Sequence, residues 1–191
     1  MSSFEIWMSR LELPLLDWIG EVFGCKAMDT VMPILSFLGD KGLLWIAIAF
    51  VFLFSKKTRK TGLMMGAAMI MGLAVCNGII KPLVDRMRPY ELVDGYALLI
   101  EPLSDGSFPS GHALASFEAA VVLMIRDKRW GIPALFFAVA ISFCRLYLYV
   151  HFPSDVLCGA IFGTGFAFLG VFAVERVLGK ISEKYPAVST W

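Results

Sequence analysis

Long apolar runs separated by short charged segments dominate this sequence. They cover, approximately, residues 43–54, 62–80, 113–125, 132–150 and 156–178. Hydrophobic residues make up 58% of the chain and charged residues 17%, against roughly 25% charged residues in ordinary soluble domains. A small soluble protein cannot bury that much apolar surface, because its surface-to-volume ratio is too high. The chain is therefore expected to lie in a lipid bilayer.

We expect the spanning segments to be α-helices, because lipid cannot satisfy open strand edges and the runs lack the alternation of a β-barrel. The five runs predict five spans, and residues 15–38 are a candidate for a sixth. The run at 43–54 is short against the ~20 residues that a bilayer helix needs, so it is expected to extend or to lie in thinned lipid. A turn is predicted at 39–42. The predicted fold is an all-α, polytopic transmembrane bundle of about six helices, in a single domain over residues 1–191.

The first 24 residues have a different pattern from the later runs. Apolar residues recur there at helical spacing, at Trp7, Leu11, Leu15, Trp18 and Val22. With acidic residues at other positions, this amphipathic pattern suits a helix in the membrane interface. The same charges argue against a signal peptide, which needs an uninterrupted apolar core. Residues 1–24 are therefore predicted to be an interfacial segment.

Lysine and arginine residues cluster in three short segments, at 56–60, 126–129 and 180–184. Alternating spans bring all three to one side of the membrane, which the positive-inside rule identifies as the cytoplasm. The C-terminus is then cytoplasmic, whereas a loop at 81–110 and a turn near 150–155 are extracytoplasmic. The net charge of +1 gives no indication of a nucleic-acid partner.

Glycines and cysteines are expected to be structural. Gly62/Gly66 and Gly159/Gly163 form GxxxG pairs, which predict close contacts between helices. The four cysteines are far apart and form no CxxC pair, so small buried side chains are favoured over a metal site or disulfides. No metal ion or other cofactor is predicted.

Both histidines, His112 and His151, fall at the predicted outer ends of apolar runs. His112 closes the segment Phe108-Pro109-Ser110-Gly111-His112, which is typical of a helix start. The free N–H groups and the dipole of a helix start favour phosphate binding. Gly111 would allow close approach, and Ser110 can cap the helix or donate its hydroxyl to an oxyanion. A capped helix with an interfacial histidine explains this segment equally well.

His151 lies between an arginine and a carboxylate in the segment Arg145–Asp155. An arginine near the end of a span is costly unless it is paired or binds an anion, and the Arg145 guanidinium matches phosphate oxygens. The Asp155 carboxylate can fix the tautomer of His151 and leave its other nitrogen free to attack. The alternative is a snorkelling arginine beside a structural His–Asp pair, but the two features together favour an anion site.

A third basic segment, Lys81–Pro89, lies on the side that should be poor in positive charge. It contains Lys81, Arg86 and Arg88. Binding of an anionic substrate explains this departure from the orientation rule. Contact with anionic lipid headgroups is the alternative, particularly for Arg86.

K-x6-RP at Lys81–Pro89, PSGH at 109–112 and R-x5-H-x3-D at Arg145–Asp155 resemble the three signature motifs of the type 2 phosphatidic acid phosphatase family, in order and in spacing. The resemblance covers roughly residues 30–178. The third motif of the family usually begins Ser-Arg, whereas Cys144 precedes the arginine here, and a cysteine is a weak hydrogen-bond donor.

The resemblance implies a metal-independent phosphatase that works through a phosphohistidine intermediate. His151 would attack phosphorus, Asp155 would orient it, and His112 would protonate the leaving oxygen and then activate water. The phosphoryl oxygens would be bound by Lys81, Arg88, Ser110, Gly111 and Arg145. Arg86 falls outside the fixed motif positions and receives no role.

A site at headgroup level is expected to take a membrane lipid phosphate. Within the family, short members of this kind resemble undecaprenyl pyrophosphate phosphatases, which recycle the carrier lipid of cell-wall synthesis. Phosphatidylglycerol phosphate, phosphatidic acid and diacylglycerol pyrophosphate are competing substrates. A transporter is disfavoured because the charges cluster at one membrane face. A non-catalytic lipid-phosphate binding protein is disfavoured because His112, His151 and Asp155 are all present.

Overall fold

The structure, a computed structural model, describes residues 3–184, with side chains from Arg10 onward. Helices and the turns between them make up most of this part, and no strand occurs in it. The elements in chain order are α1 (Ser3–Phe23), α2 (Lys26–Gly39), η1 (Asp40–Gly42), α3 (Leu43–Leu53), α4 (Arg59–Gly72), η2 (Leu73–Ile80, a π-helix), α5 (Lys81–Val84), η3 (Pro89–Leu92), α6 (Gly111–Arg126), α7 (Lys128–Tyr147) and α8 (Pro153–Lys184). The predicted all-α class is confirmed.

Within residues 3–184, four helical segments are long and apolar enough to cross a membrane: Lys26–Leu53, Arg59–Leu92, Lys128–Tyr147 and Pro153–Lys184. The first joins α2 to α3, so the short apolar run at 43–54 extends toward the N-terminus. The predicted run at 113–125 forms α6, which has only 16 residues.

The candidate sixth span at 15–38 is not one continuous helix. α1 ends at Phe23, and Cys25 has an extended backbone before α2 begins. The turn predicted at 39–42 is present as a kink between α2 and α3. There Lys41 and Gly42 have positive φ angles of 50° and 68°. Residues 15–38 therefore contribute to two helices, and only the second belongs to a long apolar segment.

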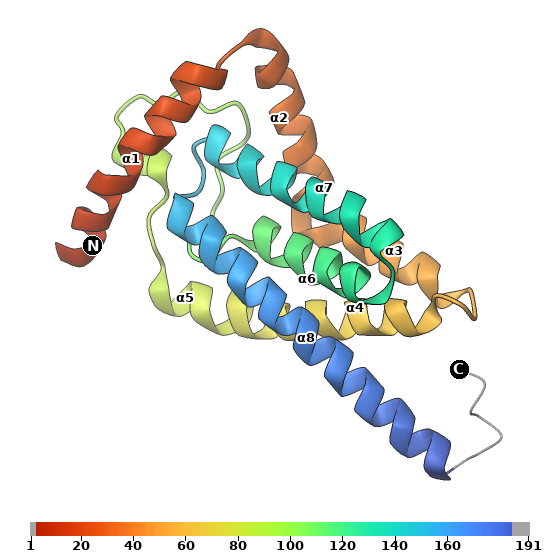
Figure 1. The fold of residues 1–191 in the computed structure, drawn as a ribbon. Helices are drawn as coiled ribbons and strands as arrows, with labels where there is room; N and C mark the ends of the chain where they lie inside the picture. The colour runs from red at the N-terminus through yellow and green to blue at the C-terminus, as the bar shows by residue number, and fades with distance from the viewer. Residues whose placement is uncertain (1–2, 185–191) are drawn as a thin grey trace.

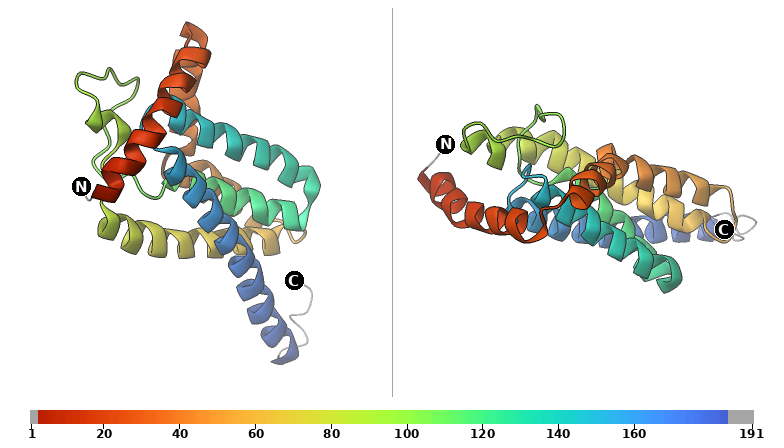
Figure 2. Two further views of the ribbon diagram at one scale, coloured as in Figure 1. Left: turned by 60° about the vertical axis from the view of Figure 1, so that its left-hand side comes forward. Right: turned by 90° about the horizontal axis from the view of Figure 1, so that it is seen from above.

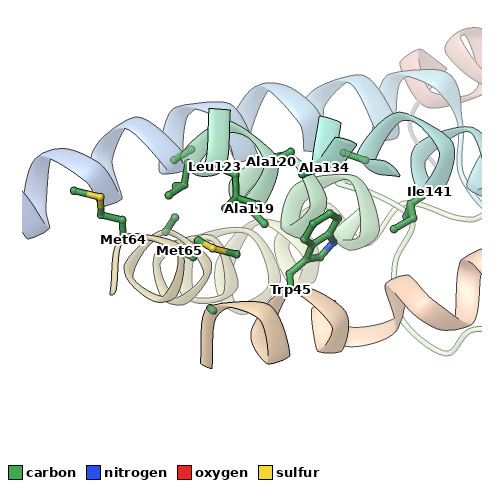
Figure 3. Packing of buried hydrophobic residues seen from close by; sticks show 13 residues of the cluster. Trp45, Met64, Met65, Ala119, Ala120, Leu123, Ala134 and Ile141 are labelled. Atoms are coloured by element: carbon green, nitrogen blue, oxygen red, sulfur yellow. The ribbon is translucent and has the colours of Figure 1, made fainter. Parts of the chain in front are cut away.

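α6 lies at the centre of the bundle, packed against α4, α7 and α8 (Figures 1 and 2). Its small residues Ala119 and Ala120 are fully buried in one cluster with the α4 residues Met64 and Met65, and Ala119 lies beside Met65 (Figure 3). Trp45 of α3 is buried in the same cluster. Small side chains let α6 approach its neighbours closely, which fixes the position of its N-terminal end.

The two GxxxG pairs behave differently. At Gly159 and Gly163 an added Cβ would lie 2.6 and 2.5 Å from carbonyl oxygens of the residues just before and within α6. Only glycine therefore permits this contact between α6 and α8. Gly62 is equally close to a carbonyl oxygen of α3, at 2.6 Å, but Gly66 has no atom within 4 Å of an added Cβ. Gly66 lines a cavity instead.

α1 lies across one end of the bundle, near the end of α7 (Figure 1). Leu16 and Ile19 are buried against the protein. The apolar stripe predicted from the sequence points away from it, because Leu11, Leu15, Trp18 and Val22 are all exposed. The side chain of Trp7 lies outside the described residues. An exposed apolar stripe on this helix is compatible with contact to lipid.

The basic clusters at 56–60 and 126–129 lie at the same end of the bundle. Lys60 and Arg126 both approach Oε1 of Glu175 in the second half of α8, at 3.6 and 3.9 Å. The predicted site residues lie at the opposite ends of the same helices. One end of the bundle therefore carries these two basic clusters, and the other end carries the predicted site residues.

Candidate active site

The predicted site residues gather at one end of a cavity of about 740 Å³. Those that line it are Lys81, Arg88, Gly111, His112, Arg145 and His151. Ser110 and Asp155 lie just behind this surface and are fully buried. The backbone N–H of Ser110 donates to the carbonyl oxygen of Asp155 at 3.1 Å, which joins the starts of α6 and α8. Segments that are distant in sequence thus meet around one space.

Arg88 determines which nitrogen of His151 is free. Its Nη1 lies 3.3 Å from Nε2 of His151 and donates to the carbonyl oxygen of Val150 at 2.7 Å. A guanidinium can only donate hydrogen bonds, so Nε2 must accept, and the neutral ring carries its proton on Nδ1. Nε2 is therefore the unprotonated nitrogen, and its electron pair, which accepts from Arg88 in this structure, belongs to a ring that lines the cavity.

Asp155 and Ser107 together hold the other side of the His151 ring. Nδ1 lies 3.4 Å from the Ser107 hydroxyl and 3.6 Å from Oδ2 of Asp155. The Ser107 hydroxyl donates to Oδ2 of Asp155, which also accepts from the backbone N–H of Phe152 at 2.8 Å. The structure thus brings Asp155 next to His151, but Ser107 shares the contact. No sequence pattern indicated a role for this serine.

His151 is almost completely buried, at 2% exposure. Burial lowers the pKa of His151 to about 3; the contact with Asp155 opposes this shift, and Arg145 and Arg88 add to it. The ring is therefore neutral at physiological pH, as a nitrogen nucleophile requires.

His112, at the start of α6, is oriented by α2. Its Nε2 lies 3.0 Å from the carbonyl oxygen of Ser36. A carbonyl only accepts, so Nε2 carries a proton and Nδ1 remains for acid–base chemistry. α2 approaches this ring so closely that a Cβ added at Gly39 would lie 2.8 Å from Cδ2 of His112. The sequence patterns did not indicate this role of α2.

Two buried polar groups at the site have no partner of their own. The Nε of Arg145 and the hydroxyl of Ser110 are both buried without a hydrogen bond, although Nη1 of Arg145 donates to the Ser36 hydroxyl. The predicted side-chain cap by Ser110 does not form. Unpaired buried polar groups are rare and costly, so both are available to a ligand.

An acidic side chain forms ion pairs with two of the predicted phosphate-binding cations. Asp105 accepts from Lys81 and from Arg88, each at 2.7 Å, and its side chain is 53% exposed. Partial burial alone would raise the pKa of Asp105, but the hydrogen bond and charge of Lys81, with Arg88, lower it to about 2. Its carboxylate oxygens lie where phosphoryl oxygens would meet these cations. Asp105 belongs to the acidic group of the 81–110 loop, but its pairing had no sequence signal.

The remainder of the cavity is mainly apolar. Its lining there comes from α3, α4 and η2 and includes Ile46, Phe50, Leu53, Met69, Ile70 and Leu73. The missing side chain of Gly66 leaves room along this wall. The cavity therefore has a cationic end, called its head, and a mainly apolar remainder. This shape suits an amphiphile with an anionic headgroup.

The chain has recognisable relatives. Residues 61–177 match the model of the PAP2 superfamily. An undecaprenyl-diphosphatase of Sulfolobus acidocaldarius is 32% identical over 145 residues, which cover 74% of this chain and 70% of that protein. The undecaprenyl-diphosphatase BcrC of Bacillus subtilis is 25% identical over 173 residues, covering 83% and 89% of the two chains.

A solved structure has the same architecture. The transmembrane PAP2 type phosphatidylglycerolphosphate phosphatase from Bacillus subtilis has a TM-score of 0.73 to this structure at 26% identity. The match covers 89% of this chain and 87% of that one. The family assignment from the three motifs is thereby confirmed: this multi-pass membrane protein belongs to the PAP2 superfamily.

Proposed function

We propose that this protein is an integral membrane phosphatase that removes phosphate from a lipid phosphate or pyrophosphate. One observation carries the proposal: two histidines and the cations Lys81, Arg88 and Arg145 line one end of a cavity whose remainder is mainly apolar. Phosphoryl transfer depends mainly on positioning and charge stabilisation, which Lys81, Arg88 and Arg145 can supply. In the part of the chain with described side chains, no three His, Cys, Asp or Glu residues are grouped to hold a metal ion.

The proposed first step is attack of Nε2 of His151 on phosphorus. A P–N bond forms, the P–O bond to the lipid breaks, and the ring becomes cationic with its proton still on Nδ1. Asp155, next to that nitrogen, stabilises the new charge. Because the Ser36 carbonyl holds Nε2–H of His112, the proton that the leaving oxygen receives comes from Nδ1 of His112. Burial, with the charge of Arg145, lowers the pKa of His112 to about 3, so the ring takes up this second proton together with the anionic substrate.

The second step hydrolyses the phosphohistidine. Neutral His112 now accepts a proton from water at Nδ1, and the oxygen of the resulting hydroxide attacks phosphorus. The P–N bond breaks, inorganic phosphate leaves, and His151 regains its free Nε2. The phosphoryl oxygens are bound throughout by Lys81, Arg88 and Arg145, with Ser110 and the N–H of Gly111.

Undecaprenyl pyrophosphate is the proposed substrate, and recycling of the cell-wall carrier lipid the proposed role. The names of the relatives from Sulfolobus and Bacillus support this choice. The structural neighbour favours phosphatidylglycerol phosphate as the first alternative. Phosphatidic acid and diacylglycerol pyrophosphate have an anionic head and apolar chains as well, so the shape of the cavity suits them equally.

The site is proposed to face the outside of the cell, with the C-terminus in the cytoplasm. The basic clusters at the end of the bundle opposite the predicted site residues support this orientation. Labelling of a Ser104→Cys variant in intact cells with a membrane-impermeant thiol reagent tests it, in a background in which the exposed Cys25 is replaced by serine. Labelling only after the cells are opened would reverse the orientation.

The test of the reaction is phosphate release by the purified protein from a panel of these lipids in detergent, with and without a chelator. His151→Ala should lose turnover by about 10⁴-fold or more, because removal of a nucleophile disables the catalytic group as a whole. Acid-labile phosphate should be trapped on the wild type and be absent from the variant. Lipid binding or flux without phosphate release would instead indicate a binding protein or a transporter.

A further inference from the structure

Arg86 has no place in the phosphate-binding wall, yet it is buried, at 8% exposure. Its Nη1 donates to Oδ1 of Asp155 and to the Ser154 hydroxyl, both at 2.7 Å. Its Nη2 donates to Oε2 of Glu12 at 2.7 Å, and its guanidinium carbon lies 3.9 Å above the Phe152 ring. The side chain is directed into the protein, which rules out the alternative of a headgroup contact.

Glu12 connects the N-terminal helix to the same point. It is 9% exposed and lies on the face of α1 that is turned toward the bundle. Its Oε1 accepts from the backbone N–H of Ser154 at 2.7 Å, and its Oε2 accepts from the Ser154 hydroxyl at 3.1 Å as well as from Arg86. One carboxylate of α1 therefore holds both Arg86 and the first turn of α8.

We propose that Arg86 and Glu12 are positioning residues that hold the Asp155 carboxylate in place for His151. The proposal rests on the function proposed above, in which His151 forms the phosphoenzyme. Arg86 fixes Oδ1 of Asp155, which leaves Oδ2 directed to the ring of His151. A metal-free site needs this support as much as a metal ligand needs its outer partners.

The charges explain why Arg86 needs Glu12 as a partner. Arg86 alone would cancel the negative charge of Asp155 in a buried place where such charges interact strongly. Glu12 compensates Arg86, so the chain Glu12–Arg86–Asp155 keeps a net charge of −1. That charge stabilises the cationic ring when His151 carries the phosphoryl group. Loss of Glu12 therefore weakens the step at His151 although Glu12 touches neither the ring nor the substrate.

The experiment compares Glu12→Gln and Arg86→Gln with the wild type, with lipid phosphate as substrate and inorganic phosphate as inhibitor. We expect each variant to lower kcat by about 10- to 100-fold. KM and the inhibition constant of phosphate should stay within about twofold, because Lys81, Arg88 and Arg145 are untouched. Glu21→Gln, on the exposed side of the same helix, is the matched control and should resemble the wild type.

A double variant separates positioning from general support of the fold. If Glu12 acts through Arg86, then Glu12→Gln should cost less than about twofold in the Arg86→Gln background. Independent multiplication of the two losses would overturn the proposal, as would a weaker phosphate affinity that parallels the loss of kcat. If Arg86→Gln does not fold, Glu12→Gln decides alone through its kcat and phosphate inhibition. An inactive wild type would instead refute the proposed function.

Discussion

Charged side chains gather at both ends of the bundle, but in opposite ways. At the cavity end, Arg88 and Arg86 are 2% and 8% exposed, and their carboxylate partners lie at 2.7 Å. At the other end, Lys60 and Arg126 approach Glu175 only to 3.6 and 3.9 Å, and the side chains remain between 32% and 49% exposed. The arginines at the cavity end are buried and tightly paired, whereas the charged side chains at the other end are exposed to solvent and loosely paired.

This difference indicates what each group is for. Removal of a charge from water costs several kcal/mol per ion, and a buried ion pair often recovers no more than that. The buried charges around His151 are therefore poor candidates for fold stability and good ones for phosphate chemistry. The exposed group costs little to keep, and the role proposed for it is in orientation in the membrane. Substitutions at the two ends should therefore differ both in the property that they change and in the size of their effects.

After His151→Ala, the largest effect is expected from His112→Ala at the cavity end. Loss of one general acid–base group typically costs about 10²- to 10⁴-fold in rate. The loss should shrink for substrates with a good leaving group, because their oxygen needs no proton. Rates for a lipid phosphate and an aryl phosphate in the same detergent measure this. Equal losses for both substrates would contradict the role of His112 as acid.

Arg88→Lys tests the same end without removal of charge. Lysine cannot contact Val150, Asp105 and His151 at once, as the guanidinium does. We expect kcat/KM to fall by about 10²- to 10³-fold, the usual cost of a lost donor to a developing oxyanion. Arg126→Lys at the opposite end is the matched control and should change kcat/KM by less than about twofold. Comparable losses in both variants would remove the distinction between the two ends.

Much of the fold could be predicted because apolar periodicity and length constrain membrane helices strongly. The runs at 62–80 and 156–178 lie within long helical segments of the structure, and the run at 132–150 extends three residues past the end of α7 at Tyr147. The interfacial segment predicted at 1–24 ends at the break at Gly24 and Cys25, whereas the candidate span at 15–38 ran across that break. The kink at Lys41 and Gly42 was visible because glycine tolerates positive φ.

The site was predictable only where residues stand in motifs. The residues that line the head of the cavity come from three such segments. Their partners do not: Ser36, Ser107 and Glu12 reach the site from α2, from a loop and from α1. Each is a common residue without local pattern, and only the packing of helices brings it within hydrogen-bond distance. Asp105 belongs to the same class, and its effect can be measured.

Asp105→Asn should make the difference between the two ends clearer, because it removes an acidic group that pairs with the site cations from the solvent side. Without this carboxylate, Lys81 and Arg88 meet phosphate without competition. Because Asp105 is half exposed and solvent screens it, we expect phosphate to bind up to about fivefold more tightly, equivalent to ~1 kcal/mol. The inhibition constant of inorganic phosphate measures this.

The pH dependence of this difference follows from the pKa of Asp105. Lys81 and Arg88 lower it to about 2, so the carboxylate stays charged from about pH 5 to pH 8. The ratio of the two inhibition constants should therefore be constant over that range and shrink only as the pH falls toward the lowered pKa. Weaker phosphate binding by Asp105→Asn would mean that the carboxylate orients the cations and does not compete for them.

The smallest effect is expected from Glu175→Gln at the opposite end. It removes the carboxylate that Lys60 and Arg126 share, at distances and exposures typical of weak surface pairs. The free energy of unfolding should change by less than about 1 kcal/mol, and kcat/KM should stay within about twofold. Thermal unfolding in detergent and the lipid phosphatase assay measure both quantities. A large loss of activity would show that the two ends are coupled along α8, and the division between a catalytic end and an orienting end would no longer hold.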